Sequence, residues 1–287
     1  MSAAGAVPPG ADRRRWPANA RVAARHLQGR AGDVAYVEGT RRLLGAPAAD
    51  LLAAPGGARD RQLLRGVALR VYEIHQGVAF VEAEADGYTG YVAADMLAPE
   101  GAPAPDAWVA IRETLGWEAP KARAMARARL SFGAGVRVLA QAEGWAETDA
   151  GHIPLSHLSQ SAVQGADPVA LAERLLGLPY LWGANGAGGI DCSGLVQLAC
   201  QAAGIPCPGD SDQQAAELGE ALPEGAALRR GDLLFWKGHV AWVAGPDRIL
   251  HANAHSMSVA YEGLGAACAR IAAAGEGPVT ARRRLPG

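Results

Sequence analysis

The chain has 287 residues, a hydrophobic content of 49% and a formal net charge of −2. It is long enough for two or three domains with full apolar cores, and its charge argues against nucleic acid or another polyanion as a partner. The basic runs at 13–15 and 282–284 are too short to alter this, and we expect both to be solvated terminal charges. No apolar segment approaches the length that crosses a bilayer, so no membrane partner is predicted.

The N-terminus has no signal-peptide pattern. Residues 6–10 read AVPPG, and the chain then turns charged, so the apolar core of a secretory signal is missing. This favours the cytoplasm, where thiols stay reduced, and we predict no disulfides among the four cysteines. Residues 1–35 are expected to form an N-terminal extension that is charged and rich in alanine, with a short helix over residues 21–26.

Two stretches of short strands, punctuated by glycine, follow the extension. The first has predicted strands over 67–72, 77–83 and 86–92, and the second over 135–139, 144–148 and 150–154. The second repeats the plan of the first about 60 residues later, which is typical of tandem small β-barrels. We place these barrels at residues 36–98 and 99–159.

A linker over residues 159–166 leads into a third domain, which we place at residues 160–287. Asp167 is predicted to cap a helix that has Pro168 at its first position. The glycine-rich loop 182–189 then precedes Asp191 and Cys192. The apolar residues that follow recur at helical spacing until Gly204 supplies a stop signal.

Cys192 is thereby placed in the first turn of a buried helix. The free N–H groups and the positive end of the dipole at that point favour a thiolate. A nucleophilic thiolate also needs a base and a group that orients the base. Cys200, Cys207 and Cys268 have no such setting, and we interpret them as small hydrophobic residues.

Two histidines on successive predicted strands can supply the base and its orienter. His239 begins the strand 239–244, and His251 lies in the strand 248–253. If the hairpin centres on Gly245, the two histidines lie opposite each other, whereas a turn centred on residues 246–247 requires side-chain reach. In either case His251 can hold His239 in the tautomer that accepts a proton. The Cys-His-His set predicts a papain-like thiol hydrolase.

A zinc site built from Cys192, His239 and His251 is the alternative interpretation of these residues. The sequence has no second cysteine at CxxC spacing and no HExxH motif. We therefore predict no metal and no other cofactor.

Five short motifs carry a resemblance to a known family. The segments PYLWG at 179–183, DCSGL at 191–195, GDLLFW at 231–236, GHVA at 238–241 and LHA at 250–252 resemble the NlpC-type cell-wall peptidases. The tandem repeats resemble bacterial SH3-like domains. This order of domains is similar to that of the γ-D-glutamyl-L-diamino-acid endopeptidases, which recycle murein peptides. The resemblance implies an α+β fold, with two SH3-like β-barrels followed by a papain-like NlpC-type catalytic domain.

The resemblance also assigns catalytic roles by position. Cys192 matches the family nucleophile, His239 the base and His251 its orienter. Tyr180 matches a tyrosine whose hydroxyl helps to hold the oxyanion beside the Cys192 backbone N–H.

The same resemblance assigns substrate binding. Asp191 and Ser193 match positions that bind the free amine of the substrate, and a barrel tyrosine completes this clamp. We choose Tyr88 for that role and keep Tyr91 in reserve, because the slot of Tyr91 more often holds core tryptophan.

Two positions depart from the family pattern. Ala184 stands where a second glycine is usual, and Gly209 stands where a basic residue is common. The second departure puts the contact with the substrate carboxylate in doubt, although it does not affect the chemistry.

The expected activity is therefore that of a cysteine endopeptidase. Its substrate would be a murein-derived peptide with a free N-terminal L-Ala, cut between γ-D-Glu and the L-diamino acid. Two alternatives stay open: a wall-peptide-binding protein, and a thiol acyltransferase or amidase that uses the same Cys-His-His site. The choice between L-lysine and diaminopimelate, the peptide length and the oligomeric state are also open.

Overall fold

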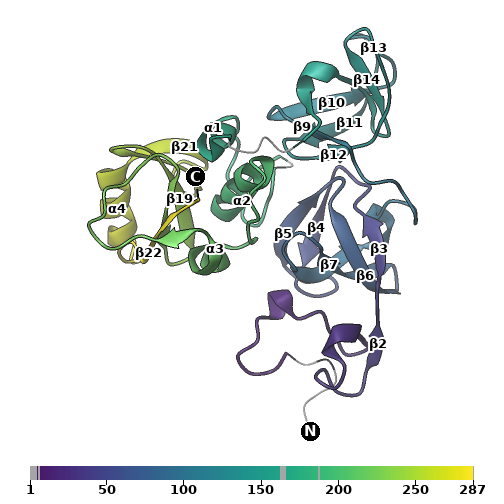
Figure 1. Ribbon diagram of the computed structural model, residues 1–287, viewed down its shortest axis with the longest axis horizontal. Coiled ribbons are helices and arrows are strands. Elements are labelled where there is room, and N and C mark those ends of the chain that lie inside the picture. The colour runs from purple at the N-terminus through teal and green to yellow at the C-terminus, as the bar shows by residue number, and fades with distance from the viewer. Residues whose placement is uncertain (1–4, 6, 162–165, 187, 287) are drawn as a thin grey trace.

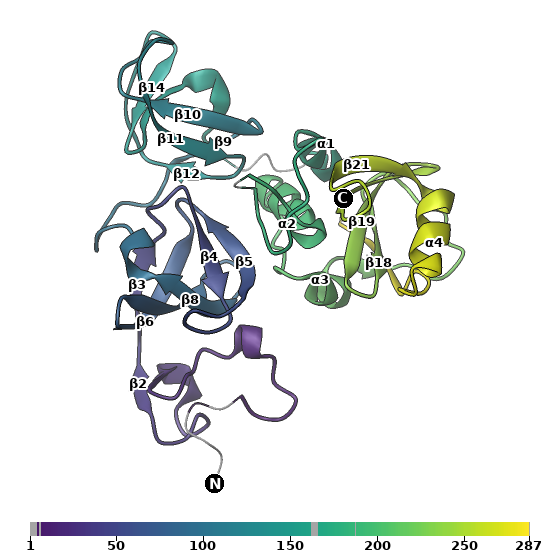
Figure 2. The ribbon, with the colours of Figure 1, turned by 180° about the vertical axis from the view of Figure 1, so that it is seen from behind.

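The computed structural model describes residue 5 and residues 7–161, 166–186 and 188–286. Two small β-lobes lie one beside the other, and the catalytic domain lies against both of them (Figure 1). Helix α2 (Cys192–Ala202) is on the side of that domain that faces the two β-lobes, as Figure 2 also shows from behind. Part of the predicted linker falls outside the described residues. Within them, no helix has the length and apolar character needed to span a bilayer.

The N-terminal segment forms a small sheet where a helix was expected. Strand β1 (Val22–Ala24) pairs in parallel with β2 (Ala35–Val37), and a short 3-10 helix, Arg25–Leu27, follows β1. Val22 and Ala24 are buried against Tyr72 and Phe80 of the first barrel. The helix predicted over 21–26 was therefore wrong, because burial against a neighbouring barrel overrides a weak local preference.

The first barrel is a six-stranded sheet in the order β3-β6-β7-β8-β4-β5. Three of its strands were predicted, whereas the earlier three were not. The strands that were not predicted carry polar residues, and two of these, Arg61 and Gln62 in β5, are buried. The bounds are β3 (Thr40–Leu43), β4 (Ala48–Leu52), β5 (Arg59–Leu64), β6 (Ala68–His75), β7 (Val78–Ala83) and β8 (Thr89–Ala93).

The second barrel combines a five-stranded sheet, β11-β10-β15-β14-β13, with a three-stranded sheet, β12-β9-β16. Its apolar core includes Val109, Leu130 and Ile153. The bounds are β9 (Ala107–Val109), β10 (Glu113–Trp117), β11 (Ala126–Ser131), β12 (Gly135–Val136), β13 (Val138–Ala142), β14 (Trp145–Thr148), β15 (Gly151–Pro154) and β16 (Leu158–Ser159).

The catalytic domain is built on a sheet in the order β17-β22-β18-β19-β20-β21. Alternate residues of its strands pack on α2 and α1 on one face, and on α4 on the other. Asp167 caps α1 as predicted, because its carboxylate accepts the Val169 N–H at 2.9 Å. The bounds are α1 (Pro168–Glu173), α3 (Ser211–Glu217), α4 (Leu264–Ala273), β17 (Glu220–Ala221), β18 (Asp232–Trp236), β19 (His239–Gly245), β20 (Arg248–Asn253), β21 (Ser258–Gly263) and β22 (Ala281–Arg284).

The arginines at 282–284 are not the solvated terminal charges that were expected. They lie in β22, between β17 and β18. The guanidinium of Arg284 donates two hydrogen bonds of 2.7 Å to the carboxylate of Asp232, whose side chain is 1% exposed. A buried carboxylate is stable only with such a partner, so this pair ties the C-terminal strand into the sheet.

Candidate active site

Cys192 is the first residue of α2, as the sequence predicts. The carboxylate of Asp191 caps the helix by accepting the Gly194 N–H at 2.7 Å. Gly194 is required by space, since a Cβ there would come within 2.9 Å of the Ala184 carbonyl oxygen. All of residues 192–200 are buried, including the polar side chains of Ser193 and Gln197.

The Cys192 thiol is enclosed rather than solvated. Cys192 is 6% exposed, and its Sγ is 4.0 Å from the carbonyl oxygen of Gly238, the residue before His239. Burial, followed by the nearby Asp191 carboxylate, raises the pKa of Cys192 to about 12, against an opposing effect of backbone N–H groups. The resting thiolate expected from the sequence is thus disfavoured, because burial outweighs the helix N-terminus.

His239 and His251 are joined by a hydrogen bond of 2.9 Å between His239 Nε2 and His251 Nδ1. Gly245 pairs with Arg248, so the hairpin centres on residues 246–247, the second of the two predicted alternatives. His239 and His251 are therefore not directly opposite each other, and their side chains span the difference. Burial lowers the pKa of His239 to about 3 and that of His251 to about 4. These shifts favour neutral imidazoles and a protonated Cys192 thiol near pH 7.

A carboxylate that the sequence did not reveal continues this line. Glu262 Oε2 lies 3.1 Å from His251 Nε2, and Arg270 of α4 donates to both Glu262 oxygens at 3.0 and 2.8 Å. Glu262 stands two residues beyond Ala260, the partner of His251 in the β20–β21 ladder, and so shares its face. That alternation is the one signal that could have found it.

Tyr180 and Ser193 both lie near the thiol. Burial is the largest cause that raises the pKa of Tyr180, and Cys192 is the next. The Ser193 hydroxyl donates to Asp191 Oδ1 at 3.1 Å, and Asp191 Oδ2 accepts the Gly183 N–H at 2.9 Å. Asp191 thus holds the start of α2 while it stays partly exposed.

Tyr88 lies in a charged group at the junction with the first barrel. We use the name Tyr88 cluster for Tyr88, Asp210, Arg14, Asp12 and Asp212. The Tyr88 hydroxyl donates to Asp210 Oδ2 at 3.0 Å, and the residue is 2% exposed. The guanidinium of Arg14 contacts all three carboxylates of the cluster at 2.6 to 2.7 Å.

The arginines at 13–15 therefore bind the body of the protein and are not free terminal charge. Besides Arg14, Arg13 pairs with Asp60 at 2.7 Å and Arg15 with Glu217 at 2.6 Å. Sequence alone gave no indication of these partners, which lie far away along the chain. The other tyrosine considered, Tyr91, is partly buried and packs on Phe80 with ring centroids 5.0 Å apart, against the apolar cluster between the N-terminal segment and the first barrel.

Arg61 places a cation beside Gly209, the position at which the family pattern commonly has a basic residue. Its guanidinium stacks on the Tyr88 ring at 5.1 Å and donates to Asp86 and to Gln197 of α2. A Cβ at Gly209 would lie 2.5 Å from Arg61 Nη1, so a side chain at 209 and this arginine compete for one space. A barrel residue thus stands at the position where the family resemblance expects a basic residue from the catalytic domain.

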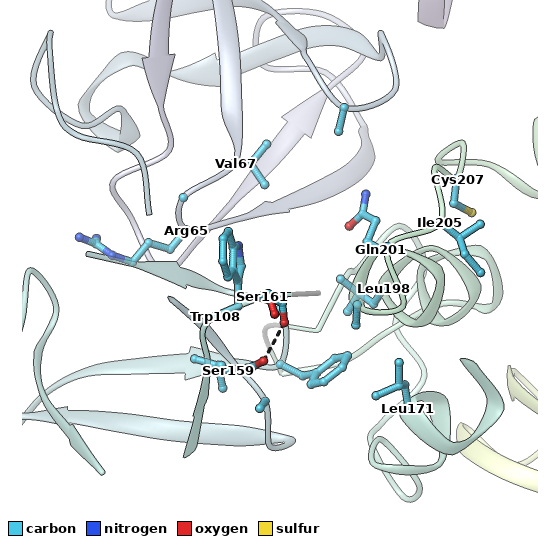
Figure 3. A pocket seen from close by; sticks show the side chains of 18 of the residues that line it. Arg65, Val67, Trp108, Ser159, Ser161, Leu171, Leu198, Gln201, Ile205 and Cys207 are labelled. Carbon is cyan, nitrogen blue, oxygen red and sulfur yellow. Dashed lines mark hydrogen bonds between the residues drawn. The ribbon is translucent and has the colours of Figure 1, made fainter. Parts of the chain in front are cut away.

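A separate cavity of about 500 Å³ lies at the other end of α2. Figure 3 shows it between the two barrels and the helix, with Trp108, Leu198 and Gln201 on its walls. None of the catalytic residues lines it. Among the described residues, no group of three or more His, Cys, Asp or Glu side chains is arranged to hold a metal ion.

Comparison with known proteins gives matches to two domain families. Residues 177–268 match the NlpC/P60 family, and residues 51–97 match the bacterial dipeptidyl-peptidase Sh3 domain. A γ-D-glutamyl-L-lysine dipeptidyl-peptidase of Bacillus subtilis is 34% identical over 110 residues, covering 36% of this chain and 36% of that protein. A probable endopeptidase of Mycobacterium tuberculosis is 35% identical over 101 residues, covering 33% and 26%. The matches span about a third of the length of these curated relatives.

A solved structure supports the fold across nearly the whole chain. An NlpC/P60 family protein from Bacillus cereus superposes with a TM-score of 0.71 at 19% identity, covering 86% of this chain and all of that one. At such low identity the likeness shows the fold and nothing finer. It confirms the α+β class predicted from the sequence. The chain therefore contains an NlpC/P60 domain, a peptidase family, preceded by a bacterial SH3 domain of the dipeptidyl-peptidase type.

Proposed function

We propose that the protein is a cysteine endopeptidase that cleaves the bond between γ-D-Glu and an L-diamino acid in murein-derived peptides. The observation that carries this proposal is the buried arrangement of Cys192, His239 and His251 within an NlpC/P60 domain. The printed name of the Bacillus subtilis relative, a γ-D-glutamyl-L-lysine dipeptidyl-peptidase, supports the choice of bond.

The proposed chemistry begins from a neutral pair. Substrate binding brings the γ-carbonyl carbon to Cys192, the thiol proton moves to His239, and the sulfur attacks that carbon. The Cys192 backbone N–H and the Tyr180 hydroxyl stabilise the oxyanion. The imidazolium of His239 then protonates the leaving amine of the diamino acid. Water, deprotonated by neutral His239, hydrolyses the thioester and releases the acid and the free thiol.

We further propose that the enzyme recognises a free N-terminal L-Ala. Asp191 is partly exposed beside Cys192, and Ser193 and Tyr88 retain oxygen lone pairs that can accept protons from a substrate ammonium. The carboxylates of Asp60 and Asp210, the second of which accepts a hydrogen bond from Tyr88, would attract the ammonium. Arg13 and Arg14, which already pair with these carboxylates, would compete with it.

Peptide hydrolysis tests the proposal directly. Purified protein would be incubated with L-Ala-γ-D-Glu-L-Lys, its diaminopimelate analogue and the N-acetylated form of each, and products would be followed by mass spectrometry. We expect L-Ala-γ-D-Glu as a product from the free peptides and rejection of the acetylated ones by about a hundredfold. Equal kcat/KM for free and acetylated peptides would overturn the amine clamp. Binding without any turnover would overturn the peptidase.

The same assay separates the acyltransferase alternative. With an added amine in excess, a hydrolase gives mainly the free acid, whereas a transferase gives mainly the amide. Intact murein carries a lactyl group on the L-Ala nitrogen, so a preference for a free amine implies a recycling role after an amidase has acted. We propose that this role is cytoplasmic, and cell fractionation with an antibody would test that location.

A further inference from the structure

We propose that Glu262 is a positioning residue that fixes the tautomers of both active-site histidines. It never touches the substrate in this proposal; it acts through His251 on His239. The inference deepens the proposed peptidase function and rests on it for its kinetic readout alone. The contacts among His239, His251, Glu262 and Arg270 that support the inference do not depend on the substrate.

The contacts form one continuous line across three strands and a helix. His239 on β19 bonds His251 on β20 at 2.9 Å, His251 lies 3.1 Å from Glu262 on β21, and Glu262 is held by Arg270 of α4. The His251 side chain is 0% exposed and that of Glu262 is 18% exposed. Among the described residues, His251 Nε2 makes no aligned hydrogen bond, and the Glu262 carboxylate at 3.1 Å is the group that it pairs with. The carboxylate is therefore the group that decides what this nitrogen does.

The charge of Glu262 decides the direction of every hydrogen bond in the line. The two donated bonds from Arg270 come first among the causes that lower the pKa of Glu262, which is thus ionised and can only accept. His251 must then carry its proton on Nε2, which leaves Nδ1 as an acceptor. His239 must in turn carry its proton on Nε2 and donate to His251.

The consequence reaches the nucleophile. With Nε2 of His239 occupied by its proton and by His251, the lone pair of His239 lies on Nδ1. This is the nitrogen left to take the Cys192 proton. In the opposite tautomer Nδ1 carries a hydrogen and cannot act as a base, which is the reason that a wrong tautomer is so damaging in hydrolases of this kind.

The charged groups around Glu262 act in the same sense. Arg270 from α4, His251 from β20 and His255 from the loop after β20 all lower the pKa of its carboxyl. Protonation of Glu262 would give the carboxyl a hydrogen to donate and would permit the opposite arrangement of both imidazoles. The geometry thus predicts that activity is lost at acid pH together with the charge of Glu262.

The test compares Glu262→Gln with a matched control, Glu173→Gln. Glu173 is also held by an arginine through two bonds of 2.9 Å, from Arg230, but it bonds Tyr261 and no histidine. The amide that Glu262→Gln introduces can donate to His251 Nε2 and so permits the wrong tautomer. Nitrogen-15 NMR of histidine-labelled protein, assigned with His239 and His251 variants, would report the tautomers directly.

We expect the wild-type protein and Glu173→Gln to show Nε2-protonated rings at both histidines. In Glu262→Gln, we expect the two histidines to populate Nδ1-protonated rings. Iodoacetamide should alkylate Cys192 of this variant at least about tenfold more slowly at pH 7. Its kcat should fall by about a hundredfold at unchanged KM. Glu262→Asp, which keeps the negative charge, should recover part of the alkylation rate.

Two results would overturn the inference. One is Nε2-protonated histidines in Glu262→Gln; the other is an equal loss of alkylation in Glu173→Gln. Failure of the proposed function looks different. If the wild-type protein cleaves none of the peptides, the NMR spectra and the alkylation rates still decide the role of Glu262. If Glu262→Gln does not fold, Arg270→Met leaves the carboxylate in place and should retain Nε2-protonated rings.

Discussion

The line of side chains from His239 to Arg270 and the Tyr88 cluster are two polar regions of opposite design. In the first, a half-buried His239 and a buried His251 lie 12 residues apart on neighbouring strands, and burial lowers the pKa of both. The second is charged, and its Arg14–Asp210 pair joins residues that are 196 apart. The first joins three neighbouring strands of one sheet to helix α4, whereas the second ties the N-terminal segment, the first barrel and the C-terminal domain together.

We expect this difference to separate chemistry from substrate recognition. Changes in the line alter proton transfer and should reduce kcat for every substrate alike. Changes in the Tyr88 cluster alter the junction of the domains, so they should affect substrate choice or stability and leave the nucleophile intact. Each prediction below can break or sharpen this separation, from the largest expected effect to the smallest.

Cys192→Ala should abolish hydrolysis of all peptides, with kcat/KM reduced by about 10⁴-fold or more, because it removes the nucleophile alone. The melting temperature should change little. Cys200→Ala, eight positions along the same helix and 0% exposed, is the control and should keep its activity. Substantial turnover by Cys192→Ala, or an equal loss in the control, would contradict the assignment.

His239→Ala should impair turnover more than His251→Ala. The base moves the protons, whereas its partner fixes the tautomer of the base. Steady-state kinetics on free and acetylated peptides would measure both variants, and the fractional loss should be the same for the two substrates. The reverse order of the two variants would exchange their roles.

Arg61→Met should lower the free energy of unfolding by about 3 kcal/mol or more, because it leaves the Asp86 carboxylate buried without its cation. The Asp86 side chain is 4% exposed. Arg41→Met, which breaks an exposed pair with Glu84, is the matched control and should cost under about 1 kcal/mol. Urea denaturation would measure both, and equal losses would show that the Arg61 pair is an ordinary surface contact.

Acid should destabilise the protein through the two histidines. Their folded pKa values, about 3 and about 4, lie below the ordinary 6.5, so between these limits the unfolded chain binds more protons than the folded one. Stability therefore falls as pH drops below about 6.5, by at most about 1.4 kcal/mol per pH unit for each histidine. Asp191, whose pKa is raised chiefly by burial, acts in the opposite direction. Denaturation of His239→Gln between pH 7 and 4 should show a shallower fall; an unchanged slope would contradict the buried neutral state.

Tyr88→Phe should have the smallest effect, confined to recognition. It removes the hydroxyl that contacts Asp210 and keeps the ring beneath Arg61. We expect the preference for free over acetylated peptide to fall by about tenfold, with kcat for the free peptide nearly unchanged. Tyr72→Phe removes a similar bond, to Glu82 within the barrel, and should leave the preference as it is. A large fall in kcat for Tyr88→Phe would contradict the division of roles between the two regions.

The sequence determined what depends on neighbours along the chain. The cap at Asp167, the helix that begins at Cys192, and the strands of His239 and His251 are local patterns, and all were predicted. The hairpin register was left open between two choices, because the Ala244 bulge that selects one has no clear signal in the sequence. Glu262 was missed because a third strand was needed to bring it beside His251.

Only the tertiary structure decided the partners of the charged residues. The arginines at 13–15 and 282–284 read as solvated ends, yet Arg13, Arg14, Arg15 and Arg284 pair with carboxylates on distant segments. It also decided the protonation of Cys192, since a helix N-terminus favours a thiolate whereas enclosure between α2 and β19 disfavours one more strongly. Hydrophobic periodicity is a local property of each segment, whereas the burial of a charge depends on which distant segments pack against it.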